Sequence, residues 1–132
     1  MDDTSTITEI LHRYYRDFSS LDPESIAPYF NEPCVFITRD GVNAAATLNE
    51  LKEGFKITAE ALRSRGYTRS ELTELQLKRL TGATVFATGI AVRYKGERDI
   101  LERVGVTYVL QKVEDGWKIV VTLIHDPNAL SP

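Results

Sequence analysis

A chain of 132 residues has the length of one domain and is too short for two well-packed cores. Its 16 basic and 19 acidic residues are mixed along the sequence and leave a net charge of −3, so the basic face that nucleic-acid binding requires is missing. No apolar run approaches the ~20 residues of a membrane span, and the acidic first residues do not resemble a secretion signal. We therefore expect one cytoplasmic domain, residues 1–132, that binds neither nucleic acid nor membrane.

Cys34 is the single cysteine, so an internal disulfide cannot form. The cysteine and histidine spacing of a zinc site is also missing, and a reducing compartment is the simpler assumption. We interpret Cys34 as a small buried apolar residue rather than as a nucleophile. We expect no metal and no other cofactor.

The first part of the chain is predicted to be helical. Thr6 and Glu9 have the spacing of a capping box, which predicts a helix that begins there and runs to about Ser20. Asp22 followed by Pro23 is typical of the start of a second, short helix. Apolar residues recur in the first helix at steps of three and four and so share one face. They are Ile7, Ile10, Leu11, Tyr14, Phe18 and Leu21.

A short strand and a third helix are predicted next. Residues Cys34–Thr38 are mostly β-branched or aromatic, and Asp40 with Gly41 forms a turn pair after them. Thr47 and Glu50 then have the spacing of a second capping box, at the start of an amphipathic segment. We expect this segment to form a long helix.

The second half of the chain is predicted to be an antiparallel meander. Its β-rich runs span about 70–80, 84–94, 100–113 and 117–125, and glycine-containing turn pairs separate them. Strands of this length twist and curl. The sequence therefore predicts an α+β fold in which a curved antiparallel sheet wraps around the N-terminal helices and encloses one pocket.

The register of the last hairpin depends on its turn. If Asp115 and Gly116 form a two-residue type I′ turn, Leu110 lies opposite Val121, Tyr108 opposite Leu123 and Val106 opposite His125. One sheet face then becomes almost wholly apolar and suits packing against the helices. Its residues are Trp117, Ile119, Val121, Leu123, Val104, Val106, Tyr108 and Leu110.

The opposite face of the predicted sheet is mixed in character. It is too apolar to face water alone, and two identical subunits can share such a surface. Its residues are Val120, Thr122, Ile124, Val109, Thr107, Arg103 and Gln111. We expect a homodimer through this outer face.

The order of these parts resembles the nuclear transport factor 2-like superfamily. The resemblance is carried by the segment Leu21–Phe30, LDPESIAPYF, and by the hairpin Glu114–Ile119, EDGWKI. It implies a cystatin-like cone with a pocket, and frequent dimers. The superfamily includes ketosteroid isomerases, limonene epoxide hydrolases, scytalone dehydratases, SnoaL-like cyclases and many proteins without known activity, so the likeness indicates fold rather than reaction.

The enzymes of the superfamily are matched only in part. Ketosteroid isomerases pair a tyrosine with two aspartates, and the resemblance places Tyr14, Thr38 and Gly105 at those positions. Threonine cannot take up a proton at neutral pH, and glycine cannot donate to a dienolate. We therefore reject that activity. Epoxide hydrolases use neighbouring Arg and Asp residues, but Arg39-Asp40 and Arg98-Asp99 are expected at solvated turns.

His125 is the candidate base. It shares strand parity with Trp117 and is expected to point into the cone, where an imidazole of pKa ~6.5 can act as a general base. The alternative is a strand-end histidine bonded to backbone or water. Tyr14 is the candidate hydrogen-bond donor, whereas His12 lies nearly opposite it on the first helix and is expected in solvent. A β-bulge before His125 would turn the imidazole outward and bring Asp126 inward.

Three functions stay open at this point. The first is a dimeric protein that binds a small molecule in an apolar pocket. The second is a cofactor-independent cyclase, dehydratase or isomerase acting on an apolar carbonyl compound. The third is a protein-association module with a filled pocket. The residues expected to contact a ligand are Tyr14, Phe18, Thr38, Tyr108, Trp117, Leu123 and His125.

Overall fold

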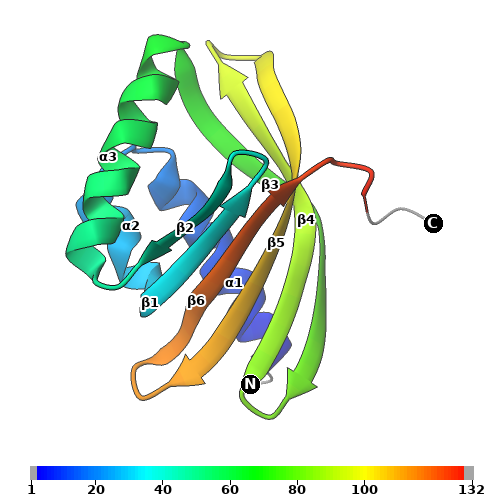
Figure 1. Cartoon of the computed structure of the whole chain (residues 1–132). Helices are drawn as coiled ribbons and strands as arrows, with labels where there is room; N and C mark the ends of the chain where they lie inside the picture. The colour runs from blue at the N-terminus through cyan, green and yellow to red at the C-terminus, as the bar shows by residue number, and fades with distance from the viewer. Residues whose placement is uncertain (1–2, 130–132) are drawn as a thin grey trace.

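Six strands form one curved sheet, and the helices lie on its inner side (Figure 1). The computed structural model describes residues 3–129. In chain order the elements are α1 (Asp3–Phe18), α2 (Pro23–Ile26), the 3-10 turn η1 (Ala27–Tyr29), β1 (Phe30–Thr38), β2 (Gly41–Ala45), α3 (Leu48–Ser64), β3 (Tyr67–Thr81), β4 (Thr84–Lys95), β5 (Asp99–Val113) and β6 (Gly116–His125).

The strand order across the sheet is β2-β1-β6-β5-β4-β3. β1 runs parallel to β6, and every other neighbouring pair is antiparallel. The long meander β3–β6 therefore curls around α1, while the short β1–β2 hairpin extends the sheet toward α3 (Figure 1). The predicted α+β cone is confirmed. Within residues 3–129, no helix is long and apolar enough to cross a membrane.

The start of α1 was predicted incorrectly. The helix begins at Asp3, so Thr6 and Glu9 lie inside its first turns rather than at its cap. Asp3 places a carboxylate at the positive end of the helix and forms a 2.6 Å ion pair with Arg79 of β3. A tertiary contact to a distant strand thus holds the start of α1, and sequence spacing alone could not indicate it.

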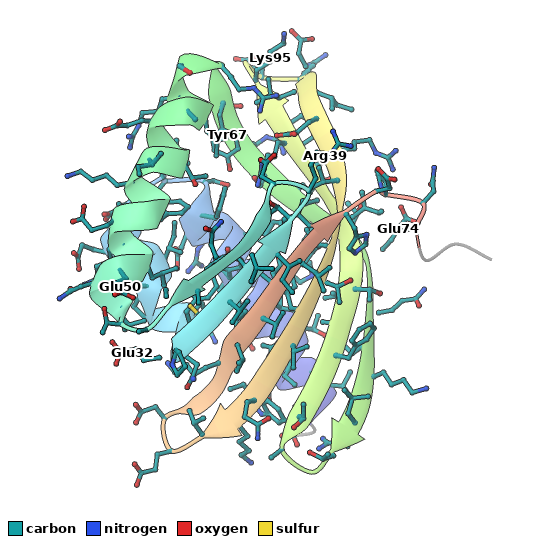
Figure 2. All side chains as sticks on the ribbon, viewed as in Figure 1. Glu32, Arg39, Glu50, Tyr67, Glu74 and Lys95 are labelled. Atoms are coloured by element: carbon teal, nitrogen blue, oxygen red, sulfur yellow. The ribbon has the colours of Figure 1, made fainter. Side chains whose placement is uncertain are left out.

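The start of α3 follows the predicted capping box and adds a tether to the sheet. Thr47 Oγ1 accepts a hydrogen bond from the backbone N–H of Glu50 at 3.2 Å, and the Glu50 carboxylate accepts from the N–H of Ala46 at 2.6 Å. Glu32 of β1 reaches across and accepts from the N–H of Leu48 at 2.6 Å. Both glutamates lie near the first turn of α3 in Figure 2. This tether fixes the helix against β1.

Two strand features differ from the prediction. The turn of the last hairpin consists of Glu114 and Asp115, because Val113 pairs with Gly116. A β-bulge follows in β6: Ile119 pairs with Leu110 and Val121 with Val109, which leaves Val120 without a partner on β5. The additional strand β2 was not predicted, because four of its five residues are exposed and give no alternating pattern.

The bulge reverses the faces of the last strand. Trp117 and Ile119 precede it and are buried, as predicted. Beyond it, Thr122 lies opposite Tyr108 and Ile124 opposite Val106, so both occupy the inner face and not the outer one. Val121, Leu123 and His125 occupy the outer face. Their predicted inward orientation is wrong, because one extra residue flips every later side chain.

His125 closes the end of β6 on the outer face. Its Nδ1 donates to the carbonyl of Asp126 at 2.9 Å, and since a carbonyl only accepts, Nδ1 carries the proton. Its Nε2 lies 2.7 Å from Thr107 Oγ1. The ring lies over Gly105, which has no side chain to obstruct it.

Replacement of Gly105 by alanine tests this register. A Cβ there would stand 2.5 Å from the Asp126 carbonyl oxygen and in collision with the His125 ring. We expect Gly105→Ala to lower the free energy of unfolding by about 1–3 kcal/mol, as overpacking does. Gly82→Ala is the matched control, since a Cβ at Gly82 meets nothing within 4 Å. Equal urea midpoints for the two variants would contradict the observed register.

Candidate functional site

A cavity of about 660 Å³ lies between the inner face of the sheet, α1 and α3. This volume lies within the ~300–1,000 Å³ typical of small-molecule sites. Aromatic side chains form much of the wall, and Phe18, Phe30, Phe36 and Phe55 are among them. At the wide end, Tyr67 of β3 lies between α3 and the sheet (Figure 2) and packs in a cluster with Leu62. The site is thus an apolar chamber inside the cone.

Two tyrosine hydroxyls meet inside the chamber. Tyr15 of α1 and Tyr108 of β5 are buried, and their hydroxyl oxygens lie 2.6 Å apart. Tyr14 packs its ring edge-on against both of these rings, at centroid distances of 5.5 and 6.2 Å. In a pair of hydroxyls only one can donate to the other, so the second O–H is left to donate elsewhere. All three tyrosines line the cavity.

These tyrosines are hydrogen-bond donors and not bases. Burial raises the pKa of Tyr15 to about 12, and it raises the pKa of Tyr14 and of Tyr108 further above the usual value. Burial disfavours the phenolate because the charge would lose its hydration. Each hydroxyl therefore keeps its proton throughout the physiological pH range.

Thr122 adds an unpaired hydroxyl to the same wall. It lies opposite Tyr108 across the β5–β6 pair and opposite Phe36 across the β1–β6 pair. Its Oγ1 is buried and has no hydrogen-bond partner among the described residues. A buried hydroxyl without a partner lowers stability. The Thr122 hydroxyl is therefore placed to form a hydrogen bond with a molecule bound in the chamber.

Arg93 of β4 brings a positive charge to the wide end of the chamber. Its Nη1 lies 3.0 Å from Glu102 Oε1, and its guanidinium carbon lies 5.7 Å from the centre of the Phe18 ring. Arg65 contacts the same carboxylate oxygen at 3.2 Å. Among the cavity-lining residues that the structure describes, Arg93 is the only basic one.

The carboxylates of the chamber lie at its rim. Asp40, in the β1–β2 turn, and Glu50, in the first turn of α3, both line the cavity and are exposed. Asp40 thus lies at an exposed turn, as expected, but this turn also borders the cavity. Arg39, Arg98 and Asp99 do not line the cavity and are exposed.

The comparisons with known proteins agree with this architecture. Residues 2–127 match the family described as NTF2-like protein (DUF6841). The chain belongs to this family. Among curated proteins, no sequence matches it.

Solved structures share the NTF2-like fold at low identity. An NTF2-like protein with a cystatin-like fold from Novosphingobium aromaticivorans is 17% identical over 98% of this chain and 84% of that one, with a TM-score of 0.79. A protein of unknown function with a cystatin-like fold from Nostoc punctiforme is 16% identical over 98% and 94%, with a TM-score of 0.76. A proposed dehydratase of the NTF2-like family from Streptomyces avermitilis is 14% identical over 94% and 95%, with a TM-score of 0.74. Identities this low carry the fold alone.

The structure separates the sequence-predicted site residues of this NTF2-like chain into two groups. Tyr14, Phe18, Thr38 and Tyr108 line the cavity. The remaining three lie elsewhere for two reasons. Trp117 is buried, but in the narrow end of the cone beside α1 and Tyr29. Leu123 and His125 lie on the outer face, because the bulge precedes them.

The other ionisable candidates lie outside the cavity. His12 is exposed on α1, as expected. Asp126 does not turn inward in place of His125; it follows the strand and is exposed. Cys34 is 2% exposed, and burial raises the pKa of its thiol, which disfavours a nucleophilic thiolate. Within residues 3–129, no three His, Cys, Asp or Glu side chains gather as metal ligands would.

Three residues of the site were missed by the sequence reasoning. Tyr15 stands four residues after Leu11 and so extends the buried face of α1, a signal that was available. Arg93 has the same strand parity as Ala87 and Ala91, which point inward. A charged residue on the inward face of a strand could have indicated a binding site. Thr122 had no such signal, because its orientation depends on the bulge.

Replacement of Thr122 by valine tests whether its hydroxyl lacks a partner. Because the exchange keeps the shape and removes an unpaired buried group, we expect Thr122→Val to raise the free energy of unfolding by about 1 kcal/mol. Thr107→Val is the matched control, since Thr107 is buried on the neighbouring strand but bonds His125. It should lower stability by a similar amount. Denaturant unfolding that shows the same loss for both variants would contradict the interpretation.

Proposed function

We propose that this protein binds a small, largely apolar molecule in the chamber and that binding, rather than strong catalysis, is its activity. The observation that carries the proposal is a cavity with aromatic walls that also contains hydrogen-bond donors without an acceptor. One hydroxyl of the Tyr15–Tyr108 pair and the hydroxyl of Thr122 are available inside it. Small-ligand sites combine apolar walls with a few such placed polar groups.

The donors favour a particular kind of guest. The tyrosines stay protonated, so the interior presents O–H groups toward an acceptor oxygen rather than a base toward an acidic C–H. A ketone, ester or carboxylate oxygen would accept from the free hydroxyl of the Tyr15–Tyr108 pair or from Thr122, while its apolar part contacts the phenylalanine walls. This complementarity supports binding of an amphipathic carbonyl compound.

The enzymatic alternative has weaker support. A cyclase, dehydratase or isomerase that acts without a cofactor needs a general base beside the reacting carbon. His125, the candidate for that role, lies on the outer face with both ring nitrogens engaged. The proposed dehydratase from Streptomyces avermitilis shares the fold at 14% identity, which does not carry its reaction to this chain.

The association-module alternative requires a filled cone. Among the described residues, side chains leave about 660 Å³ of the chamber open. A core packed only for stability leaves few voids larger than a water molecule. The retained space therefore favours a ligand over a purely structural interior.

A thermal-shift screen with matched variants tests the binding proposal. Because a ligand that binds only the folded state raises Tm, hydrophobic carbonyl compounds such as 2-acetonaphthone should stabilise the wild-type protein. Loss of one neutral hydrogen bond in Tyr108→Phe should weaken affinity about 2- to 10-fold. Tyr94→Phe is the control, because Tyr94 of β4 does not line the cavity. A panel of such compounds that leaves Tm unchanged would refute the proposal.

We also infer that two copies associate through the outer sheet face. The helices lie on the inner side (Figure 1), and the outer face carries half-buried apolar side chains on four adjacent strands. They are Val35, Ile37, Phe86, Val109, Val121 and Leu123. Apolar patches that lack a covering element are typical of subunit contacts. An isologous dimer would cover the patch on both copies at once.

Sedimentation velocity at micromolar concentration tests the dimer. The wild-type protein should sediment as a dimer, and Leu123→Lys should be monomeric, because the contact would have to bury an unpaired ammonium group. Ile57→Lys is the matched control: Ile57 is 72% exposed on α3, away from the outer sheet face. It should remain dimeric. A wild-type monomer would overturn the inference.

A further inference from the structure

We propose that the ligand of the chamber is an organic acid whose carboxylate is bound by Arg93. The proposal rests on the binding function inferred above and specifies its chemical class. It follows from the placement of one guanidinium group beside the aromatic wall of the cavity, in which Arg93 is the only basic residue among those that the structure describes.

The position of Arg93 is fixed by strand pairing. Ser70 of β3 and Glu102 of β5 are its direct neighbours across the two pairs that β4 forms. Its parity along β4 matches that of Ala87 and Ala91, which are buried on the inner face. The sheet therefore directs Arg93 into the cone and does not leave it free to turn into solvent.

The charge around Arg93 is not neutralised. Glu102 forms ion pairs with both Arg93, at 3.0 Å, and Arg65, at 3.2 Å, through the same oxygen. Two guanidinium groups and one carboxylate leave a formal charge of +1 in this group. On the chamber side it is flanked by Ser70 and by the Phe18 ring, whose centre lies 5.7 Å from the Arg93 guanidinium carbon, and neither carries a charge. An anion at this point would complete the charge balance.

Arg93 also keeps free donors. A guanidinium carries five N–H groups arranged in a planar fork that fits a carboxylate. Within residues 3–129, the hydrogen bonds of Arg93 involve only Nη1, which donates to Glu102. Nη2 and Nε are therefore available, and a bound carboxylate could accept from both.

The guanidinium and the tyrosines act on the same space. The Phe18 ring lies 5.7 Å from the Arg93 guanidinium carbon and 6.0 Å from the Tyr14 ring, and Tyr15 and Tyr108 line the same cavity. A carboxylate bound by Arg93 would therefore share the cavity with the free hydroxyl of the Tyr15–Tyr108 pair. The apolar part of the acid would contact the phenylalanine walls.

The carboxylates at the rim of the chamber repel an acidic ligand only weakly. Asp40 and Glu50 are exposed, so water and salt screen their charges. Glu50 in addition accepts the backbone N–H of Ala46. The Arg93 side chain is only 21% exposed, so its attraction for an anion is screened less. A cationic ligand would be repelled by Arg93 and only weakly attracted by the rim carboxylates. A neutral ligand would gain no ionic attraction from Arg93.

Three naphthalene probes of matched size test the proposal on the wild-type protein: 2-naphthoate, the neutral ketone 2-acetonaphthone and the cation 2-naphthylmethylammonium. Binding is measured by calorimetry at pH 7 and low salt. We expect 2-naphthoate to bind about 10- to 100-fold more tightly than the ketone, as an ionic hydrogen bond would give. The cation should bind most weakly.

Variants test whether Arg93 causes the preference for 2-naphthoate over 2-acetonaphthone. Arg93→Gln should abolish it by weakening only 2-naphthoate, and the variant should fold, because Arg65 still pairs with Glu102. Arg93→Lys keeps the charge and should keep part of the preference, since a lysine lacks the planar fork. Arg98→Gln is the matched control: Arg98 is an exposed arginine in the β4–β5 turn, and both affinities should stay unchanged.

The outcomes separate this inference from the binding function. Equal affinity for 2-naphthoate and 2-acetonaphthone in the wild-type protein would overturn the acid inference and leave the chamber as a binding site for neutral compounds. A preference that survives in Arg93→Gln would overturn the role of Arg93. Failure of all three probes to bind would contradict both this inference and the binding function on which it rests.

Discussion

The arrangement of the chamber depends on one extra residue in the last strand. Val120 has no partner on β5, and every side chain after it changes face. The change brings Thr122 and Ile124 into the cavity and sends Leu123 and His125 to the outside. Without the bulge the interior would contain an imidazole; with it, the inner end of the chamber is built from hydroxyl and aromatic groups. The chemistry open to the protein follows from that exchange.

The outer end of β6 shows how the register is held. His125 joins the carbonyl of Asp126 to the hydroxyl of Thr107, and its ring needs the space that Gly105 leaves. A strand with one buried face resists slippage because a one-residue shift would exchange its apolar and polar sides. The contacts of His125 also favour the observed register, because they can form only when His125 lies beside Gly105 and Thr107. His125 thus stabilises the pairing of β6 with β5 and does not line the cavity.

Inside the cone, several polar groups keep unused hydrogen-bonding capacity, and this gives the site its character. Tyr15 and Tyr108 satisfy each other in one direction only, Thr122 is unpaired among the described residues, and Arg93 shares its single acceptor with Arg65. Buried polar groups are normally paired, and unpaired ones reduce stability. The NTF2-like fold itself is shared with structures at 17% identity and below in the comparisons described above. The arrangement of donors is a feature of this chain's own side chains.

The sequence by itself determined the α+β cone, the capped α2 and α3, the meander and the NTF2-like family, because each depends on local spacing or on the order of elements. Tyr14, Phe18 and Tyr108 could be placed at the cavity because helical periodicity and the alternation of side chains along β5 set their faces, whereas Thr38 was placed there by the family resemblance. Only the tertiary structure decided the orientation of Thr122 and His125. A bulge forms where strand pairing and curvature across the whole sheet require it, so the residues beside it carry no local signal.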